Sequence, residues 1–224
     1  MDLKQVAGER AVEYVKDGMV VGLGTGSTVY FTIKRLGMMV AEGFEIIGIP
    51  TSIHTEKIAK ESGIRLTTLE EHPEIDVTID GADEVDPNLN LIKGMGGALL
   101  REKIVASATK MEVIVVDPSK MVDILGTKSP LPVEVASFGW KNCQNELKKL
   151  GCEAKLRLKE GAPYLSDNNN YIVDCSFEKI GNPENLESEI NNIPGVMENG
   201  LFLGIADIVI IGTEDGGKLF SKPL

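Results

Sequence analysis

The sequence feature that most constrains the fold is a short, mainly apolar run followed by a polar turn, which occurs four times in the first half of the chain. The apolar runs are residues 19–23, 45–49, 75–79 and 113–116. Runs of this length read as buried strands, and the segments between them carry the 3.6-residue apolar spacing of helices. Buried strands that alternate with helices indicate a mostly parallel sheet covered on both sides. The sequence therefore predicts an α/β fold.

Polar residues and glycines gather directly after these strands, in residues 24–28, 50–52, 80–83 and 117–120. Open parallel sheets bind ligands beyond the carboxyl ends of their strands, where loops and helix N-termini meet. We expect the four turns to face one crevice.

The pattern changes near residues 129–132, where two prolines interrupt the chain. The elements that follow have the order β-α-β-β-α-β, which is typical of a ferredoxin-like α+β domain. We predict such a small domain over 129–204. Residues 207–211 form another buried strand, so 1–128 and 205–224 are expected to make the Rossmann-like domain. The strands expected in the small domain are 133–135, 153–159, 171–176 and 200–203, with helices through Leu147 and Leu150 and from about Asn182.

Charge and composition narrow the possible partners. A formal net charge of −11 opposes binding to nucleic acid over a broad surface, since such binding needs a dense basic face. We find no basic stretch followed by an apolar run and no apolar segment of membrane-spanning length, and we expect no membrane partner. The three cysteines form no CxxC pair, which fits a reducing, cytoplasmic location. An anionic ligand would need local positive charge.

Metal and triad chemistry are also constrained, because the chain has only two histidines, His54 and His72. His54 lies at an expected helix start and His72 in a polar turn, where capping and solvation are the simpler interpretations. We expect no metal and no other cofactor.

The turn at residues 24–28, Gly-Thr-Gly-Ser-Thr, has the makings of a phosphate site. Glycines allow close backbone approach, the hydroxyls donate, and the following helix offers unpaired amides. It lacks the lysine of a Walker loop and the full G-x-G-x-x-G spacing, so simple phosphate is favoured over a nucleotide. A tight turn with Ser27 or Thr28 as a helix cap remains the alternative.

Charged residues follow in three further segments. Residues 80–86 contain four acids, which fail the calcium-loop pattern but include Asp80 and Asp83 as acceptors for sugar hydroxyls. Lys93 opens a second glycine-rich loop. On periodicity alone, residues 101–103 are a solvated helix face and Lys120 is a surface lysine. Only the combination of these carboxylates and lysines with the glycine-rich loops indicates a catalytic site.

These motifs resemble those of the ribose-5-phosphate isomerase A family, and they occur in order along essentially the whole chain. The matching segments are residues 22–28, 80–84, 93–103, 117–120, 123–126, 130–135, 193–196 and 200–202. The resemblance implies interconversion of ribose 5-phosphate and ribulose 5-phosphate in the pentose phosphate pathway, by a cytosolic enzyme that forms homodimers or homotetramers and needs no metal.

The resemblance also implies roles for individual residues. Glu102 is the implied acid/base that moves a proton between C1 and C2, with Lys93 the best candidate to stabilise the enediolate. Met95 stands where many members have glycine. The implied phosphate ligands are Lys4, Thr25, Gly26, Ser27 and Thr28, and the residues implied to line the sugar are Asp80, Gly81, Ala82, Asp83, Lys93, Gly94, Met95, Gly96 and Lys120.

Two other functional classes remain open from the sequence. One is an amino-sugar phosphate deaminase-isomerase with a similar phosphate loop, which would release ammonia. The other is a non-enzymatic phosphosugar sensor, against which the lack of a DNA-binding segment counts.

Overall fold

In a computed structural model of the chain, which describes residues 2–221, the contacts divide the protein into two compact units. The larger unit comprises Met1–Ala82, Arg101–Met121 and Ile205–Leu224, and the smaller unit comprises Asp83–Leu100 and Val122–Gly204. Among residues 2–221, no helix is both long and apolar enough to cross a membrane.

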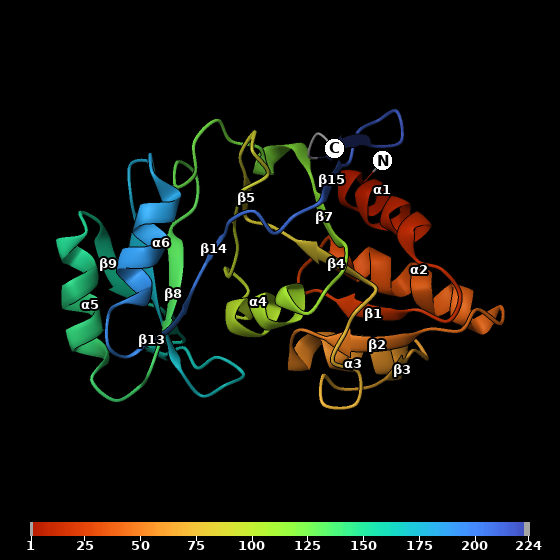
Figure 1. Cartoon of the computed structure of the whole chain (residues 1–224), viewed down its shortest axis with the longest axis horizontal. Coiled ribbons are helices and arrows are strands. Elements are labelled where there is room, and N and C mark those ends of the chain that lie inside the picture. The colour runs from red at the N-terminus through yellow and green to blue at the C-terminus, as the bar shows by residue number, and fades with distance from the viewer. Residues whose placement is uncertain (1, 222–224) are drawn as a thin grey trace. The chain divides into compact units, whose positions relative to one another are not determined.

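A seven-stranded sheet forms the centre of the larger unit (Figure 1). Its order is β16-β15-β7-β4-β1-β2-β3, and every pairing is parallel except that of β15 with β16. Strand order reverses between β1 and β4, the place where doubly wound sheets bind ligands. The strands are β1 (Val20–Leu23), β2 (Ile47–Pro50), β3 (Arg65–Leu66), β4 (Val77–Gly81), β7 (Glu112–Val116), β15 (Ile208–Ile211) and β16 (Lys218–Ser221).

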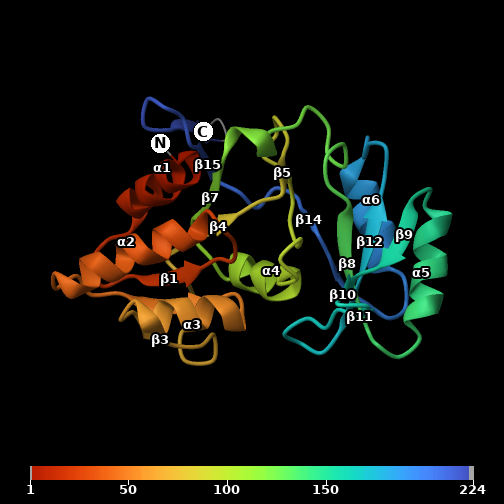
Figure 2. The same cartoon turned by 180° about the vertical axis from the view of Figure 1, so that it is seen from behind.

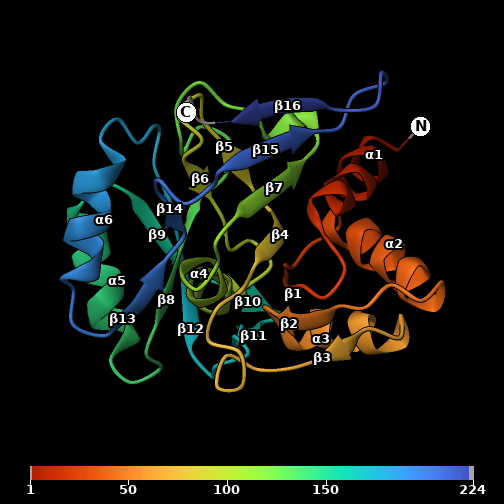
Figure 3. The same cartoon turned by 45° about the vertical axis from the view of Figure 1, so that its right-hand side comes forward.

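Helices cover both faces of this sheet. Ala7, Ile33 and Ala59 bring α1, α2 and α3 into one core cluster with the strands, and α1 and α2 lie side by side (Figure 3). Val105 of α4 packs in another cluster with Ile49 of β2. Burying a side chain of the size of Ile33 or Val105 contributes roughly 1.5–3 kcal/mol. The helices are α1 (Leu3–Arg10), η1 (Ala11–Tyr14), α2 (Val29–Ala41), α3 (Ile53–Glu61), α4 (Leu99–Ser107) and η2 (Pro118–Lys120).

The smaller unit contains a four-stranded antiparallel sheet of order β13-β8-β12-β9. Helices α5 and α6 supply Leu147 and Ile190 to a core on one face of it (Figure 2). This is the ferredoxin-like arrangement, so the predicted fold class is confirmed for both sheets. The elements are β8 (Leu131–Val135), α5 (Trp140–Lys149), β9 (Glu153–Leu156), β10 (Leu158–Lys159), β11 (Ala162–Pro163), β12 (Tyr171–Ser176), α6 (Pro183–Asn191) and β13 (Val196–Asn199).

The strand predicted near residues 200–203 is present, but its predicted place in the small sheet is wrong. The last strand of the four-stranded sheet is β13, and residues Leu201–Phe202 form β14 in a separate sheet with β5 (Glu84–Val85) and β6 (Leu91–Ile92). Gly200 marks the change, because its N–H donates to Pro132 O while its carbonyl accepts from Lys93 N–H.

The two units also differ from the predicted division of the chain at 83–100 and 122–128, which the contacts place with the small sheet. Glu84 explains part of this grouping. Its fully buried carboxylate accepts hydrogen bonds from the amides of Gly126, Lys128 and Ser129 at 2.5–2.6 Å. The predicted domain boundaries themselves stay a prediction.

Candidate active site

The turn after β1 is held by the side chain of Asp80 from the neighbouring strand β4. Asp80 is 1% exposed, and its Oδ1 accepts hydrogen bonds from Thr25 N–H at 3.0 Å and Gly81 N–H at 2.7 Å. A Cβ on Gly24 would lie 2.2 Å from the same oxygen, so only glycine allows the approach. Asp80 therefore shapes the glycine-rich turn, and its predicted contact with sugar hydroxyls stays a prediction.

The hydroxyl of Thr25 anchors the turn to the start of α3. It lies 2.8 Å from the hydroxyls of Thr51 and Ser52 and 3.1 Å from that of Thr55. All three partners are buried. The sequence placed residues 50–52 after a strand without assigning them a role; three hydroxyls at a strand end were the available signal.

A lysine approaches the next hydroxyl of the turn. Lys4 Nζ donates to Ser27 Oγ at 3.0 Å, which places positive charge beside the first turn of α2. Thr28 is the N-cap residue of α2, yet its side chain makes no capping hydrogen bond. The helix-cap alternative is thus wrong for Thr28, and the Ser27 hydroxyl faces a cation.

Lys4 and Lys120 also share an acidic neighbour. Burial raises the pKa of Asp117, but hydrogen bonds from Ser119 and the charges of Lys4 and Lys120 outweigh it, so the pKa of Asp117 lies below its usual value. Asp117 Oδ1 accepts from Ser119 N–H at 2.9 Å at the start of η2. Lys4 on α1 and Lys120 at the end of η2 therefore both place positive charge near the carboxylate of Asp117, a residue to which the sequence assigned no task of its own.

Glu102 lies on the buried side of α4 and is 5% exposed. The interpretation of residues 101–103 as a solvated face is therefore wrong for Glu102. Helical spacing explains its burial, since Leu99, Val105 and Ala106 lie three or four positions away and are buried too. The sequence therefore contained a signal for the burial of Glu102, namely an acid at helical spacing from apolar residues.

In the smaller unit, Lys93 is 2% exposed, and its Nζ lies 5.4 Å from the centre of the Phe202 ring. A charge is costly to bury without compensation, so a buried lysine at a loop is typical of a functional group. Lys93, which opens the second glycine-rich loop, is thus a packed side chain.

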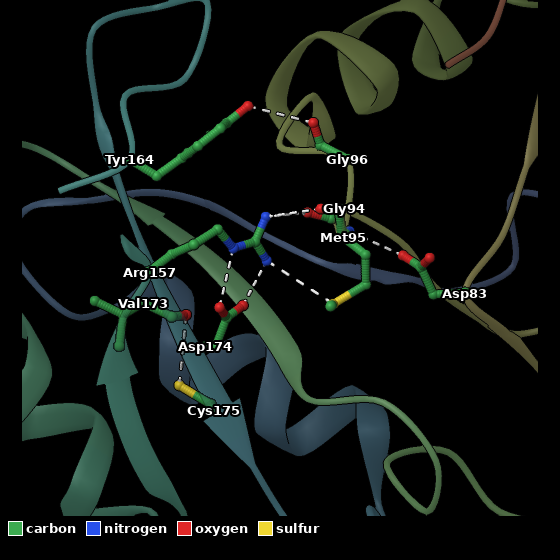
Figure 4. A network of polar contacts seen from close by, with 9 residues as sticks. All are labelled: Asp83, Gly94, Met95, Gly96, Arg157, Tyr164, Val173, Asp174 and Cys175. Carbon is green, nitrogen blue, oxygen red and sulfur yellow. Dashed lines mark hydrogen bonds and ion pairs between the residues drawn. The ribbon is translucent and has the colours of Figure 1, made fainter. Parts of the chain in front are cut away.

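Asp83 holds the loop that follows Lys93. Its Oδ2 accepts from Met95 N–H at 2.9 Å (Figure 4). Its own N–H donates to Ile92 O at 2.8 Å. Met95 is 45% exposed, and its sulfur lies 3.9 Å from Nη2 of Arg157, a residue that the sequence did not single out.

The predicted site residues are thus distributed over both units. The larger unit contains the phosphate-loop residues and Glu102, and the contacts there link Thr25 with Asp80 and Lys4 with Ser27. The members in the larger unit are Lys4, Thr25, Gly26, Ser27, Thr28, Asp80, Gly81, Ala82, Glu102 and Lys120, and those in the smaller unit are Asp83, Lys93, Gly94, Met95 and Gly96. Within residues 2–221, no group of three or more His, Cys, Asp or Glu side chains is arranged to hold a metal ion.

Comparison with known proteins decides the family. The model of the family "Ribose 5-phosphate isomerase A (phosphoriboisomerase A)" matches residues 47–216. The chain belongs to the ribose 5-phosphate isomerase A family. A ribose-5-phosphate isomerase A from Bacillus mycoides is 52% identical over 219 residues, which cover 97% of this chain and 99% of the relative. One from Pyrococcus abyssi is 47% identical over 226 residues, covering 99% and 98%.

Solved structures of ribose 5-phosphate isomerases have the same fold. One, solved in complex with phospho-erythronic acid, superimposes with a TM-score of 0.96 at 44% identity and covers 99% of this chain and 98% of its own. Another, from Methanocaldococcus jannaschii, has a TM-score of 0.94 at 44% identity and covers 99% of both chains. The family resemblance and the fold expected from the sequence are confirmed.

Proposed function

We propose that this protein interconverts D-ribose 5-phosphate and D-ribulose 5-phosphate, the aldose-ketose isomerisation of the non-oxidative pentose phosphate pathway. The observation that carries the proposal is the near full-length identity of 52% with a ribose-5-phosphate isomerase A. The phosphate of the substrate binds at the turn after β1, where Ser27, Thr28, Lys4 and the amides of α2 are available.

Glu102 is proposed as the base that moves the proton. Its carboxylate removes the proton from C2 of the open-chain aldose, which leaves an enediol(ate) across C1 and C2. Return of a proton to C1, with transfer of a proton from O2 to O1, gives the ketose. One carboxylate serves both carbons because C1 and C2 are adjacent. Burial of Glu102 within a helix face keeps competing water away from the base.

The charge that develops on the two oxygens needs donors. Lys93 and the amides of residues 94–96 are proposed to face these oxygens, since a fixed donor in a site of low dielectric stabilises an oxyanion strongly. Lys120 and Asp83 are proposed to bind sugar hydroxyls, together with the backbone of residues 81 and 82. Asp80 contributes by shaping the phosphate turn.

The proposal also covers the cofactor requirement, the cellular location and the oligomeric state of the protein. Neither metal nor cofactor is needed, because a carboxylate and a lysine supply the base and the electrophile. Three free thiols, Cys143, Cys152 and Cys175, support a cytoplasmic location. We propose a homodimer or homotetramer.

One assay tests the proposal directly. Purified protein is incubated with ribose 5-phosphate, and the appearance of ketose is followed. Turnover supports the proposal. Release of ammonia from glucosamine 6-phosphate without ketose formation from ribose 5-phosphate would instead identify a deaminase-isomerase, and binding of ribose 5-phosphate without turnover would identify a sensor.

A further inference from the structure

Arg157, directly after β9, makes contacts with the glycine-rich loop that no feature of the reaction so far explains. Its Nη1 donates to Gly94 O at 2.9 Å and to Met95 O at 3.0 Å (Figure 4). Nε and Nη2 of the same guanidinium bind the two carboxylate oxygens of Asp174, with Nε at 2.9 Å from Oδ2. The Arg157 side chain is only 12% exposed and that of Asp174 is 21% exposed.

Side chains alternate between the two faces of the small sheet, and this alternation places Asp174 on the face that lies beside the loop. Val173 and Cys175 of β12 are fully buried in the core beneath α5 and α6, so Asp174 between them points to the opposite face. In the adjacent strand, Pro132 pairs with Asp174 and lies close to Gly94, since a Cβ on Gly94 would approach Pro132 Cβ to 3.2 Å. The loop therefore lies over the face that carries Asp174.

The contacts of Arg157 with the two carbonyls also fix the direction in which the neighbouring backbone amides point. In a planar trans peptide, the C=O and the N–H point in opposite directions. The carbonyls of Gly94 and Met95 share their peptides with the amides of Met95 and Gly96, so both amides point away from Arg157. Met95 N–H accordingly donates to Asp83 Oδ2 at 2.9 Å. The amide of Gly97 is already used by Gly94 O. Gly96 N–H is the amide that this arrangement directs toward a ligand.

A tyrosine fixes the other end of the loop. Tyr164 pairs with Arg157 through its backbone N–H, and its hydroxyl donates to Gly96 O at 3.3 Å. Gly97 has φ +79°, and a Cβ there would lie 2.3 Å from the Tyr164 hydroxyl oxygen. The loop is thus packed tightly against a ring that also lies 5.8 Å from the guanidinium carbon.

We propose that Arg157, held by Asp174, is a positioning residue for the isomerisation, which aligns the peptides of residues 94–96 so that the Gly96 amide and the neighbouring Lys93 meet the oxyanion of the substrate. This rests on the proposed function. Lysine would not replace Arg157, because only the planar fork of a guanidinium can bind two carbonyls and a carboxylate at once. Arg157 itself touches no reacting atom.

The test compares R157A, R157K and D174N with a matched control, K155A. Lys155 lies on β9 two residues before Arg157, and its side chain is 70% exposed beside Glu153. For R157A we expect kcat with ribose 5-phosphate to fall about 10- to 100-fold, while KM changes less than about threefold because the phosphate turn is untouched. R157K and D174N should lose less than R157A, and added guanidinium should restore part of the kcat of R157A. K155A should stay within about twofold of the wild type.

Two measurements separate positioning from a general effect on the fold. Amide hydrogen exchange of the peptide containing residues 94–97 should be faster in R157A and D174N, at unchanged thermal unfolding midpoint. Phospho-erythronic acid should bind more weakly in proportion to the loss of kcat, while inhibition by inorganic phosphate stays the same. R157A with wild-type kcat, or with a loss matched by K155A, would overturn the proposal.

Failure of the proposed function gives a different result. If the wild type does not isomerise ribose 5-phosphate, the assignment of the reaction fails. The exchange of residues 94–97 and the affinity for phospho-erythronic acid still decide whether Arg157 orients the loop: unchanged values in R157A reject it, and coupled changes support it.

Discussion

At the scale of single residues, Glu102 carries the most specific expectation. The change Glu102→Gln keeps the size of the side chain and removes its basicity. A positioned base contributes typically 10²- to 10⁴-fold, so kcat should fall by about that factor while KM changes little. Steady-state kinetics measure both constants, and circular dichroism checks the fold. Near-normal turnover by the folded variant would remove Glu102 from the mechanism.

The path of the proton gives a second expectation for the same carboxylate. If one base serves both carbons, part of the deuterium from C2-labelled ribose 5-phosphate should reach C1 of the ketose, diluted by exchange of the carboxyl proton with solvent. Mass spectrometry of early product measures the transfer. Deuterium at C1 that is diluted by solvent hydrogen supports a single shuttle base. Complete transfer of the deuterium to C1 with none lost to solvent would instead favour a direct 1,2-hydride shift, and complete washout would show only that exchange outruns the second transfer.

Ser27 and Thr28 are the residues proposed to bind the phosphate of the substrate. Replacing both by alanine removes two hydroxyl donors, including the partner of Lys4. Each hydrogen bond to a charged group is worth about 1.5–3 kcal/mol, so KM should rise by about tenfold or more. Ser107→Ala is a suitable control, because its exposed hydroxyl donates to the carbonyl of Ile104 within α4. An unchanged KM in the double variant would reject the assignment.

At the scale of elements, the carboxylate of Asp117 at the start of η2 contributes to the free energy of unfolding in a pH-dependent way. The pKa of Asp117 in the folded protein lies below the ordinary value of 3.8. Its carboxylate therefore stabilises the fold at pH values above 3.8, and this contribution is lost as the pH falls through the lower folded-state pKa. Asp117→Asn should lower the free energy of unfolding at neutral pH, and the difference from the wild type should vanish in acid.

Urea unfolding at several pH values measures this difference. Asp123→Asn, a change at an exposed position in the following segment, is the matched control for the loss of one acidic side chain. A constant difference between Asp117→Asn and the wild type down to the lowest pH would contradict the electrostatic role of Asp117.

The elements that could be predicted from the sequence are those whose signal is local. The strands β1, β2, β4 and β7 are apolar runs with turns behind them, and the return of β15 to the large sheet follows from four consecutive aliphatic residues. The order of the small domain follows from the alternation of its elements. These signals need no knowledge of distant partners, because burial alone produces the pattern.

What the sequence could not provide depends on contacts between distant segments. β5, β6 and β14 have two residues each, and β6 pairs with β14 across more than 100 positions, so no periodicity marks them. The contact of Arg157 with Gly94 spans 63 positions in the same way. For the site, the loops were found by composition, whereas the hydroxyl cluster at Thr25 required the register of β1 with β2.

At the scale of the whole molecule, the reaction is expected to proceed without a metal ion. In the proposed mechanism a carboxylate and a lysine supply the proton transfer and the charge stabilisation, so that mechanism requires no Lewis acid. Prolonged dialysis against EDTA should leave kcat and KM for ribose 5-phosphate unchanged. Elemental analysis after dialysis verifies that metal has been removed. Lost activity that one divalent metal restores would overturn this expectation.

Self-association is the last expectation, and it concerns two opposing properties of the chain. Exposed apolar side chains on the smaller unit favour association; Phe138 is 95% exposed, Leu158 is 58% exposed and Leu165 is 53% exposed. A net charge of −11 on each copy opposes it through repulsion, which salt screens over about 8–10 Å at physiological ionic strength. Sedimentation equilibrium at micromolar concentration should therefore give at least twice the chain mass of 24.2 kDa, and the association should strengthen from low to physiological salt. A single 24.2 kDa species at every salt concentration would contradict a homo-oligomer.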